Sequence, residues 1–149
     1  MVSPKPIPEA LYRKIVGVMP IPCVDAVIVR GKKFLLGKRI NKPAKGQWFV
    51  IGGRVLKGES LEAAVRRHVQ TETGISGVKV KKFLIAAPTM FKNSAQGPSS
   101  HTINSVFLVE LSEKKLLLNN ENEKLKWFSR IDKNWHPYVK NVLQLAGFK

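Results

Sequence analysis

The chain has 149 residues, of which 44% are hydrophobic, and it carries a formal net charge of +16. This length suffices for one domain that buries about two thirds of the surface of the unfolded chain. The single cysteine, Cys23, excludes an internal disulfide, and no apolar run reaches the roughly 20 residues that a membrane-spanning helix needs. The start lacks the apolar core of a signal peptide, so we expect one domain over residues 1–149, no membrane partner and a cytoplasmic location.

The positive charge raises the question of a polyanionic partner, since clustered lysine and arginine drive binding to nucleic acid. The basic residues are instead scattered along the chain in short pairs, without interleaved aromatic residues. A general cationic surface that attracts phosphorylated ligands is the simpler explanation. We therefore expect no dedicated nucleic-acid partner.

Hydrophobic periodicity and turn residues predict an alternation of strands and helices. The predicted elements are a helix at 9–18, strands at 23–30 and 34–39, a strand at 48–53, a helix after Ser60, strands at 77–87 and 101–111, a short edge strand at 125–129 and a helix at 132–145. Mixed strands with helices packed on both faces indicate an α/β/α sandwich with a mixed β-sheet.

The double glycine and the helix after it form the segment with the clearest chemistry. Ser60 can cap this helix, and His68 and Glu72, four residues apart, share one of its faces. Gly52 and Gly53 permit close approaches that a side chain would forbid, so a main-chain carbonyl can turn toward a cation. A loop, a helix and one carboxylate can thus build a site for magnesium and diphosphate. The apolar stripe of the helix is Leu61, Ala64, Val65 and Val69.

The spacing of this segment is specific. Gly53 is followed after five residues by Glu59, after seven more by Arg67, and then by Glu72 and the pair 74–75, Gly-Ile. An ordinary amphipathic surface helix would explain the EAAVRR run but not these fixed positions. The segment resembles the Nudix box, G-x5-E-x7-R-E-U-x-E-E-x-G-U with U aliphatic. In that family the first glutamate and the arginine hold loop to helix as an ion pair, so the resemblance implies a structural role for Gly53, Glu59 and Arg67.

Two metal-site glutamates of the Nudix box are replaced here, by His68 and Thr71. A longer stretch, FLLGKRINKPAKGQWFVIGGRV at 34–55, is similar to GDP-mannose mannosyl hydrolases, a Nudix branch with the pattern FLLGKRxNxPAxGxWFVPGGRV. That branch also lacks the extra glutamates and keeps the one at Glu72. The similarity, weaker at both ends, covers roughly the first 130 residues.

The branch implies roles for four residues around the substrate. Arg39 and Arg54 match arginines that contact the diphosphate, and a guanidinium can pair two phosphate oxygens at once. Asp25 matches an aspartate that contacts the sugar or its leaving carbon, with a paired structural acid as the alternative. His101 matches a histidine of the related enzymes and is a candidate substrate contact, with a structural role as the alternative.

The same resemblance implies that the loop at 119–126 contributes a metal ligand and the general base. The branch has a Gln-His pair there, which aligns with residues 122–123 in one register and 121–122 in the other. Neither register supplies a histidine. We expect Glu121 to join Glu72 and the Gly52 carbonyl as a ligand of Mg²⁺, with Mn²⁺ as a substitute, and Glu123 to act as the general base. A solvated polar turn is the alternative for this loop.

The resemblance as a whole implies a magnesium-dependent hydrolase of a nucleotide diphosphate sugar such as GDP-mannose, in which water attacks the anomeric carbon. Attack of water on phosphorus, the ordinary Nudix reaction, stays open as an alternative. A non-catalytic nucleotide-sugar-binding protein is a third hypothesis, from a different class. Members of the branch are dimers, so a homodimer is an expected assembly.

Overall fold

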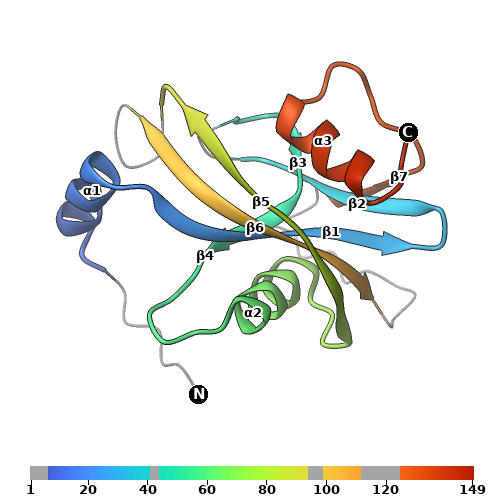
Figure 1. Ribbon diagram of the computed structural model, residues 1–149, viewed down its shortest axis with the longest axis horizontal. Helices are drawn as coiled ribbons and strands as arrows, with labels where there is room; N and C mark the ends of the chain where they lie inside the picture. Colours follow the sequence, from blue (N-terminus) through green and yellow to red (C-terminus); the bar gives the residue numbers. More distant parts are fainter. Residues whose placement is uncertain (1–6, 41–43, 94–98, 112–124) are drawn as a thin grey trace.

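The computed structural model describes residues 7–40, 44–93, 99–111 and 125–149. In these residues a seven-stranded sheet has the order β3-β2-β1-β6-β5, while β4 pairs with β1 and β7 with β2 (Figure 1). The strands are β1 (Ile21–Arg30), β2 (Lys33–Lys38), β3 (Trp48–Phe49), β4 (Ile51–Arg54), β5 (Val78–Phe91), β6 (Ser100–Leu111) and β7 (Leu125–Phe128). The helices are α1 (Glu9–Val18), α2 (Leu61–Thr73) and α3 (Pro137–Leu145).

Strand β1 lies at the centre of the sheet. It runs antiparallel to β2 and β4 and parallel to β6, so the sheet is mixed. Both faces of β1 are covered, which explains its nearly continuous apolar run. Val24 and Ala26 belong to the core beneath α2, whereas Val27 belongs to the core beneath α3. The one acidic residue in this run, Asp25, is also buried.

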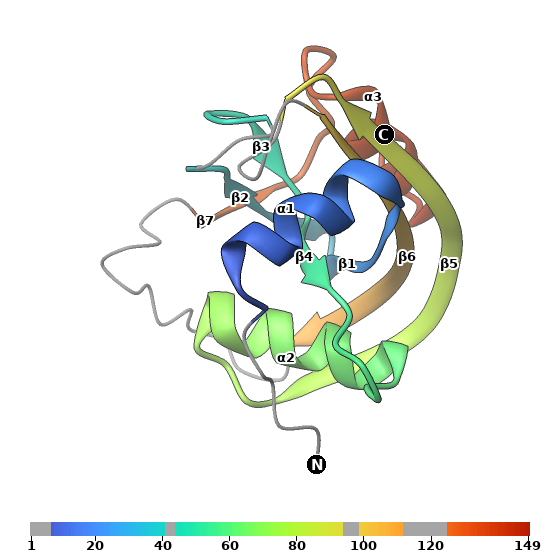
Figure 2. The same cartoon turned by 90° about the vertical axis from the view of Figure 1, so that its left-hand side faces the viewer.

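Helices α2 and α3 cover opposite faces of the sheet, as Figure 2 shows with α2 below and α3 above. On one face Ala64, Val65 and Val69 of α2 pack into the first core, and on the other Val139 and Val142 of α3 pack into the second. The predicted α/β/α sandwich with a mixed sheet is confirmed.

Helix α1 begins and ends at the predicted residues but buries none of its side chains. Its apolar residues Leu11 and Val18 are 50% and 82% exposed. Figure 2 shows the helix crossing in front of β4 at one end of the sheet. The helix therefore lies against the edge of the two cores and contributes little to either.

Three predicted elements have different bounds in the structure, for clear physical reasons. The last helix begins at Pro137 instead of residue 132, because Asn134 N donates to Asp132 Oδ1 at 2.8 Å in a turn and proline suits the first helical turn. The predicted strand at 48–53 divides at Val50 into β3 and β4, which pair with different partners, β2 and β1. Strand β5 also continues past residue 87 to Phe91, because it stays paired with β6 along that length.

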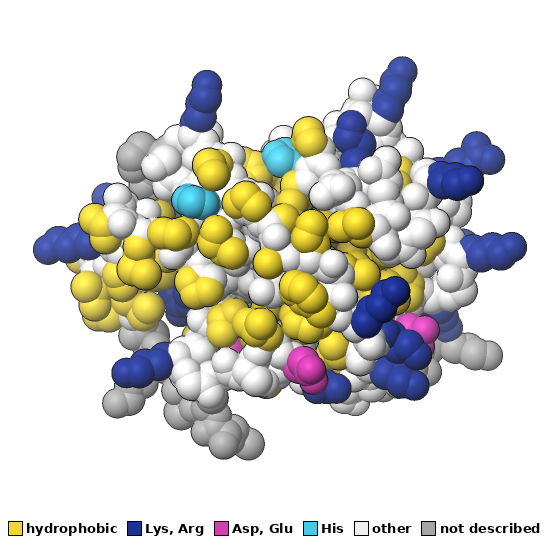
Figure 3. Space-filling model, viewed as in Figure 1, with side chains coloured by type: hydrophobic (Ala, Val, Ile, Leu, Met, Phe, Trp, Pro, Cys, Tyr) yellow, Lys and Arg dark blue, Asp and Glu magenta, His cyan; other side chains and the backbone are white. Residues whose placement is uncertain are grey.

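One face of the molecule carries a band of hydrophobic side chains, with lysine and arginine projecting around its margin (Figure 3). Phe83, Met90 and Ile103 of β5 and β6 are among the exposed large hydrophobic residues. On this face the cations are dispersed, as the sequence predicts. None of the helices formed by the described residues has the length and apolar character needed to cross a membrane.

Candidate active site

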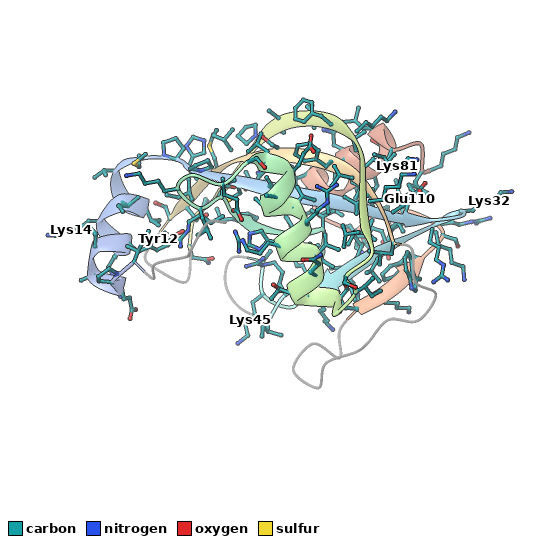
Figure 4. The ribbon with its side chains drawn as sticks, turned by 90° about the horizontal axis from the view of Figure 1, so that it is seen from below. Tyr12, Lys14, Lys32, Lys45, Lys81 and Glu110 are labelled. Atoms are coloured by element: carbon teal, nitrogen blue, oxygen red, sulfur yellow. The ribbon has the colours of Figure 1, made fainter. Side chains whose placement is uncertain are left out.

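Helix α2 is fixed at both ends by local contacts. The Ser60 hydroxyl accepts a hydrogen bond from Ala63 N at 3.1 Å, which satisfies one of the free amides of the first turn. At the other end Gly74 adopts φ 73°, a left-handed conformation that glycine accepts without a steric penalty. In Figure 4, where the molecule is seen from below, α2 lies in front of the sheet.

The loop before α2 is held to the helix by a two-point ion pair. Arg67 Nε donates to Glu59 Oε2 at 2.8 Å, and Arg67 Nη2 donates to Glu59 Oε1 at 2.9 Å. Leu56 N donates to the same carboxylate at 3.1 Å. The hydrogen bonds from Arg67 lower the pKa of Glu59, and those to Glu59 raise the pKa of Arg67. Both groups therefore stay charged and hold the loop in place.

His68 lies where the Nudix box has a glutamate, and its ring packs against the double glycine. A Cβ at Gly53 would overlap the ring, with Nδ1 and Nε2 of His68 both 2.9 Å away. Nε2 also lies 2.9 Å from the Arg54 carbonyl oxygen, which accepts a further hydrogen bond from Arg67 Nη2 at 3.0 Å. Burial lowers the pKa of His68, so the ring favours its neutral form.

Asp25 lies on β1 directly opposite Gly52 on β4. Its Oδ1 occupies the space that a Cβ at Gly52 would need, so glycine permits this close approach. Its Oδ2 accepts a short hydrogen bond from the Tyr138 hydroxyl of α3. Burial raises the pKa of Asp25 to about 7, although the Tyr138 hydrogen bond and the charge of Arg39 lower it. Asp25 therefore changes charge near neutral pH.

Arg39 follows β2 and connects the two sides of the site electrostatically. Burial lowers the pKa of its guanidinium, while the carboxylates of Asp25 and Glu72 favour its charged form. Asp25 comes from the centre of the sheet and Glu72 from α2. The structure thus brings three of the predicted site residues into one electrostatic neighbourhood.

Arg54 and His101, the two other predicted substrate contacts, lie on β4 and β6. The Arg54 guanidinium stacks over the Tyr12 ring of α1, with 4.7 Å to the ring centroid. Figure 4 labels Tyr12 on α1 at one end of the molecule. His101 lies at the start of β6, opposite Met90 of β5. It is partly buried, and its strand position is the predicted one.

The described residues contain two of the three predicted metal ligands. Glu72 is partly exposed on α2 and Gly52 offers a main-chain carbonyl, which are the hard oxygen ligands that Mg²⁺ prefers. Mg²⁺ usually keeps several waters, so two protein oxygens fit a partial ligand set. Within the described ranges no three His, Cys, Asp or Glu residues come together as a metal cluster. The predicted ligand Glu121 and the predicted base Glu123 lie outside the described residues.

Sequence reasoning missed Tyr138 and a polar network on the same face of the sheet as Asp25. Thr89 Oγ1 and Thr102 Oγ1 lie 2.6 Å apart, and Asn104 Nδ2 donates to the Ala87 carbonyl at 3.1 Å. Asn104 is an amide residue within a predicted strand, and this is a signal that could have identified it. Tyr138 offered no such signal, because its position in the apolar stripe of a helix indicates only packing.

Cys23, the single cysteine of the chain, lies on β1 and its side chain is partly exposed. Burial, together with the charge of Asp25, raises the pKa of its thiol to about 12. The thiol therefore stays protonated at neutral pH and is not a nucleophile.

The sequence matches the NUDIX domain family over residues 19–144. It is 34% identical to the low-salt glycan biosynthesis protein Agl8 of Haloferax volcanii over 139 residues, 92% of this chain and 88% of that protein. It is 33% identical to the ADP-ribose pyrophosphatase of Methanocaldococcus jannaschii over 109 residues, 73% of this chain and 62% of that protein. The crystal structure of a MutT NUDIX hydrolase from Burkholderia pseudomallei superposes with a TM-score of 0.69 and 25% identity, covering 85% of this chain and 98% of that one. The chain belongs to the Nudix hydrolase family.

Proposed function

We propose that the protein hydrolyses a nucleotide diphosphate sugar, with GDP-mannose as the first candidate, to a nucleoside diphosphate and a free sugar. The observation that carries this proposal is that the partly buried Arg39 guanidinium interacts electrostatically with both the buried Asp25 and Glu72 of α2. A cation for the diphosphate is thus coupled to an acid for the sugar and to a carboxylate for the metal. The similarity to a glycan biosynthesis protein over most of the chain supports a sugar-containing substrate.

The metal would be held by Glu72, the Gly52 carbonyl and Glu121, with magnesium as the first candidate and manganese as a substitute. When bound, it supplies positive charge that stabilises a departing diphosphate. Nudix hydrolases generally use a divalent metal of this kind.

The residues of the chain have distinct roles in the proposed reaction. Arg39 and Arg54 bind the diphosphate oxygens and stabilise the charge that develops on them. Asp25 contacts the sugar, and His101 is a further candidate contact. A bond forms between the water oxygen and the anomeric carbon as the bond from that carbon to the diphosphate oxygen breaks. Glu123 takes a proton from the water, and the diphosphate leaves with the electron pair of the broken bond.

Attack of water on phosphorus is the second candidate. The similarity to an ADP-ribose pyrophosphatase favours it, although this chain spans less than two thirds of that protein. The products would then be a nucleoside monophosphate and a sugar phosphate. The two reactions use the same metal and arginines and differ in which atom the water reaches.

A panel of nucleotide sugars together with ADP-ribose, assayed with Mg²⁺ or Mn²⁺ in oxygen-18 water, tests both candidates. Label in the free sugar supports attack on carbon, and label in a phosphate product supports attack on phosphorus. Tight binding of a nucleotide sugar without turnover would support the non-catalytic hypothesis instead. Glu123→Gln and Glu121→Gln then separate the base from the metal ligand, because only Glu121→Gln should weaken metal binding.

A further inference from the structure

The residue that replaces a motif glutamate makes a specific contact of its own. His68 Nε2 lies 2.9 Å from the carbonyl oxygen of Arg54, and the imidazole covers Gly53 so closely that no larger residue fits there. Both contacts are to the backbone of the segment that presents Arg54. An ordinary packing residue would contact side chains of the core instead.

The hydrogen-bonding pattern determines which ring nitrogen carries the proton. A carbonyl oxygen can only accept, so the 2.9 Å contact requires a proton on His68 Nε2. Arg67 Nη2 has two protons, which are directed to Arg54 O at 3.0 Å and Glu59 Oε1 at 2.9 Å. Its 3.4 Å separation from His68 Nε2 is therefore a secondary contact. The Arg54 carbonyl thus receives two donors from consecutive residues of α2.

We propose that His68 is a positioning residue of the diphosphate site, which holds the backbone at Gly53 and Arg54 against α2 instead of binding the metal. This inference rests on the proposed function in one respect, namely that Arg54 meets a nucleoside diphosphate. Without the His68 donor, the bond from Arg67 is the one side-chain hydrogen bond from the described residues that the Arg54 carbonyl keeps. The turn from β4 into the following loop is then less restrained, and so is the direction of the Arg54 side chain.

The proposal also explains the departure from the Nudix box. A glutamate at position 68 would place an acceptor against the Arg54 carbonyl, which is also an acceptor, so the bond would be lost. Gly53 and His68 fit each other because the ring fills the space that glycine leaves. Thr71, which replaces the other glutamate of the Nudix box, is exposed instead. We therefore expect that restoring the family glutamate impairs ligand binding at position 68 but not at position 71.

The test measures binding of Mg²⁺ and of GDP by calorimetry for His68→Gln, His68→Ala, His68→Glu and Thr71→Glu. His68→Gln keeps a donor and should bind GDP with little change, whereas His68→Ala and His68→Glu should weaken GDP about tenfold, the equivalent of one ordinary hydrogen bond. Thr71→Glu should bind Mg²⁺ at least as tightly as the unchanged protein. Gln70→Ala is the matched control, because it removes a 3.1 Å bond from the same helix to the Ser76 carbonyl, away from the site.

Three results would overturn the proposal. His68→Glu would bind Mg²⁺ more tightly if this position were a dormant metal ligand. His68→Gln would be as weak as His68→Ala if the donated hydrogen bond were irrelevant. Nitrogen-15 spectra of the imidazole, recorded without any ligand, would show the proton on Nδ1 if the assigned contact were wrong.

The same measurements separate this proposal from the proposed function. If the unchanged protein binds Mg²⁺ and GDP but hydrolyses no nucleotide sugar, the proposed function fails while the order of GDP affinities still decides the role of His68. If it binds no GDP in the presence of Mg²⁺, the role of His68 at a diphosphate site is overturned as well. Thermal unfolding of each variant distinguishes a local effect from loss of the fold.

Discussion

The two faces of the sheet hold their polar groups in different ways. On the α2 face the charged and polar side chains are tied to one another and to the backbone, as the Glu59–Arg67 pair shows. On the α3 face a neutral network ties Thr89, Thr102 and Asn104 together, and beside it the buried acid Asp25 accepts a hydrogen bond from Tyr138 and feels the charge of Arg39. The α2 side is therefore a rigid support whose charges persist at neutral pH. The α3 side contains the group whose charge changes there.

The two faces therefore have different roles: the α2 face fixes the geometry of the site, and the α3 face contains a group that titrates. The ion pair, the helix cap at Ser60 and the His68 contact fix where the loop before α2 lies. Asp25 is buried beneath Tyr138, so its ionisation is controlled by its surroundings. Mutations on the α2 side should change binding and stability, while those on the α3 side should change the response to pH.

The largest effect is expected at Glu72, the carboxylate of α2 that we assign to the metal. Glu72→Gln should lower activity about 100-fold or more, because a bound metal supplies several kcal/mol of charge stabilisation. Titration of activity with Mg²⁺ should show a higher requirement, with the unfolding temperature almost unchanged. Glu62→Gln, an exposed acid in the first turn of the same helix, is the control and should have little effect. Normal turnover at limiting Mg²⁺ would remove Glu72 from the metal site.

Arg39 is expected to come next, since it connects the two faces. Arg39→Ala should cost roughly 1.5 to 3 kcal/mol of binding or transition-state stabilisation, the range for hydrogen bonds to charged groups. Arg39→Lys should restore only part of the lost stabilisation, because an ammonium group is a point charge whereas a guanidinium group can pair two oxygens at once. Steady-state kinetics with the preferred nucleotide sugar measure the loss. Arg130→Ala, an exposed and remote cation, controls for the general field of the protein.

Equal kinetics for Arg39→Ala and the unchanged protein would exclude the residue from the phosphate site. Arg54→Ala provides a second comparison, because this guanidinium stacks on the Tyr12 ring of α1. If only Arg54 mattered, the substrate would lie nearer to α1 than we propose.

The ion pair before α2 should affect stability more than chemistry. Arg67→Met leaves the Glu59 carboxylate, which is only 6% exposed, with one backbone donor, and should lower the free energy of unfolding by about 1–3 kcal/mol. Because the pair lowers the pKa of Glu59, its contribution is present above the unfolded pKa and is lost as the pH falls through the folded one. Denaturant titrations should therefore show the difference shrinking at acidic pH. Arg66→Met, the exposed neighbour, should change little.

The α2 side was largely predictable from sequence, because its contacts are local and its spacing is fixed. The ends of α1, the Ser60 cap and the glycine at the end of α2 follow from capping and periodicity. The Glu59–Arg67 contact spans eight positions and follows from the motif. The role of His68 did not follow, because the motif predicts a carboxylate there and gives no reason for a ring.

The α3 side was much less predictable. Asp25 and Tyr138 are 113 positions apart, and no local pattern links a strand acid to a helix tyrosine at that separation. The start of α3 was misplaced because residues 132–135 have a helix-compatible pattern but form a turn stabilised by the Asp132 side chain. Contacts of this kind depend on tertiary packing, which sequence periodicity does not encode.

Tyr138→Phe is expected to have the smallest effect at neutral pH and the clearest effect on pH dependence. The folded pKa of Asp25, about 7, lies above its ordinary value of 3.8, so the folded state binds more protons between these values and stability falls as the pH rises through that window. The Tyr138 bond lowers this pKa, so Tyr138→Phe should raise it and extend the fall to higher pH, at a cost of about 1 kcal/mol at pH 7. Asp25→Asn should abolish the decrease in stability with rising pH. Thermal unfolding from pH 4 to 9 measures these slopes, with Tyr12→Phe as the control. Of the other groups near Asp25, Cys23 keeps its proton in this range and Arg39 keeps its charge, so a slope that survives in Asp25→Asn would assign the titration to another residue.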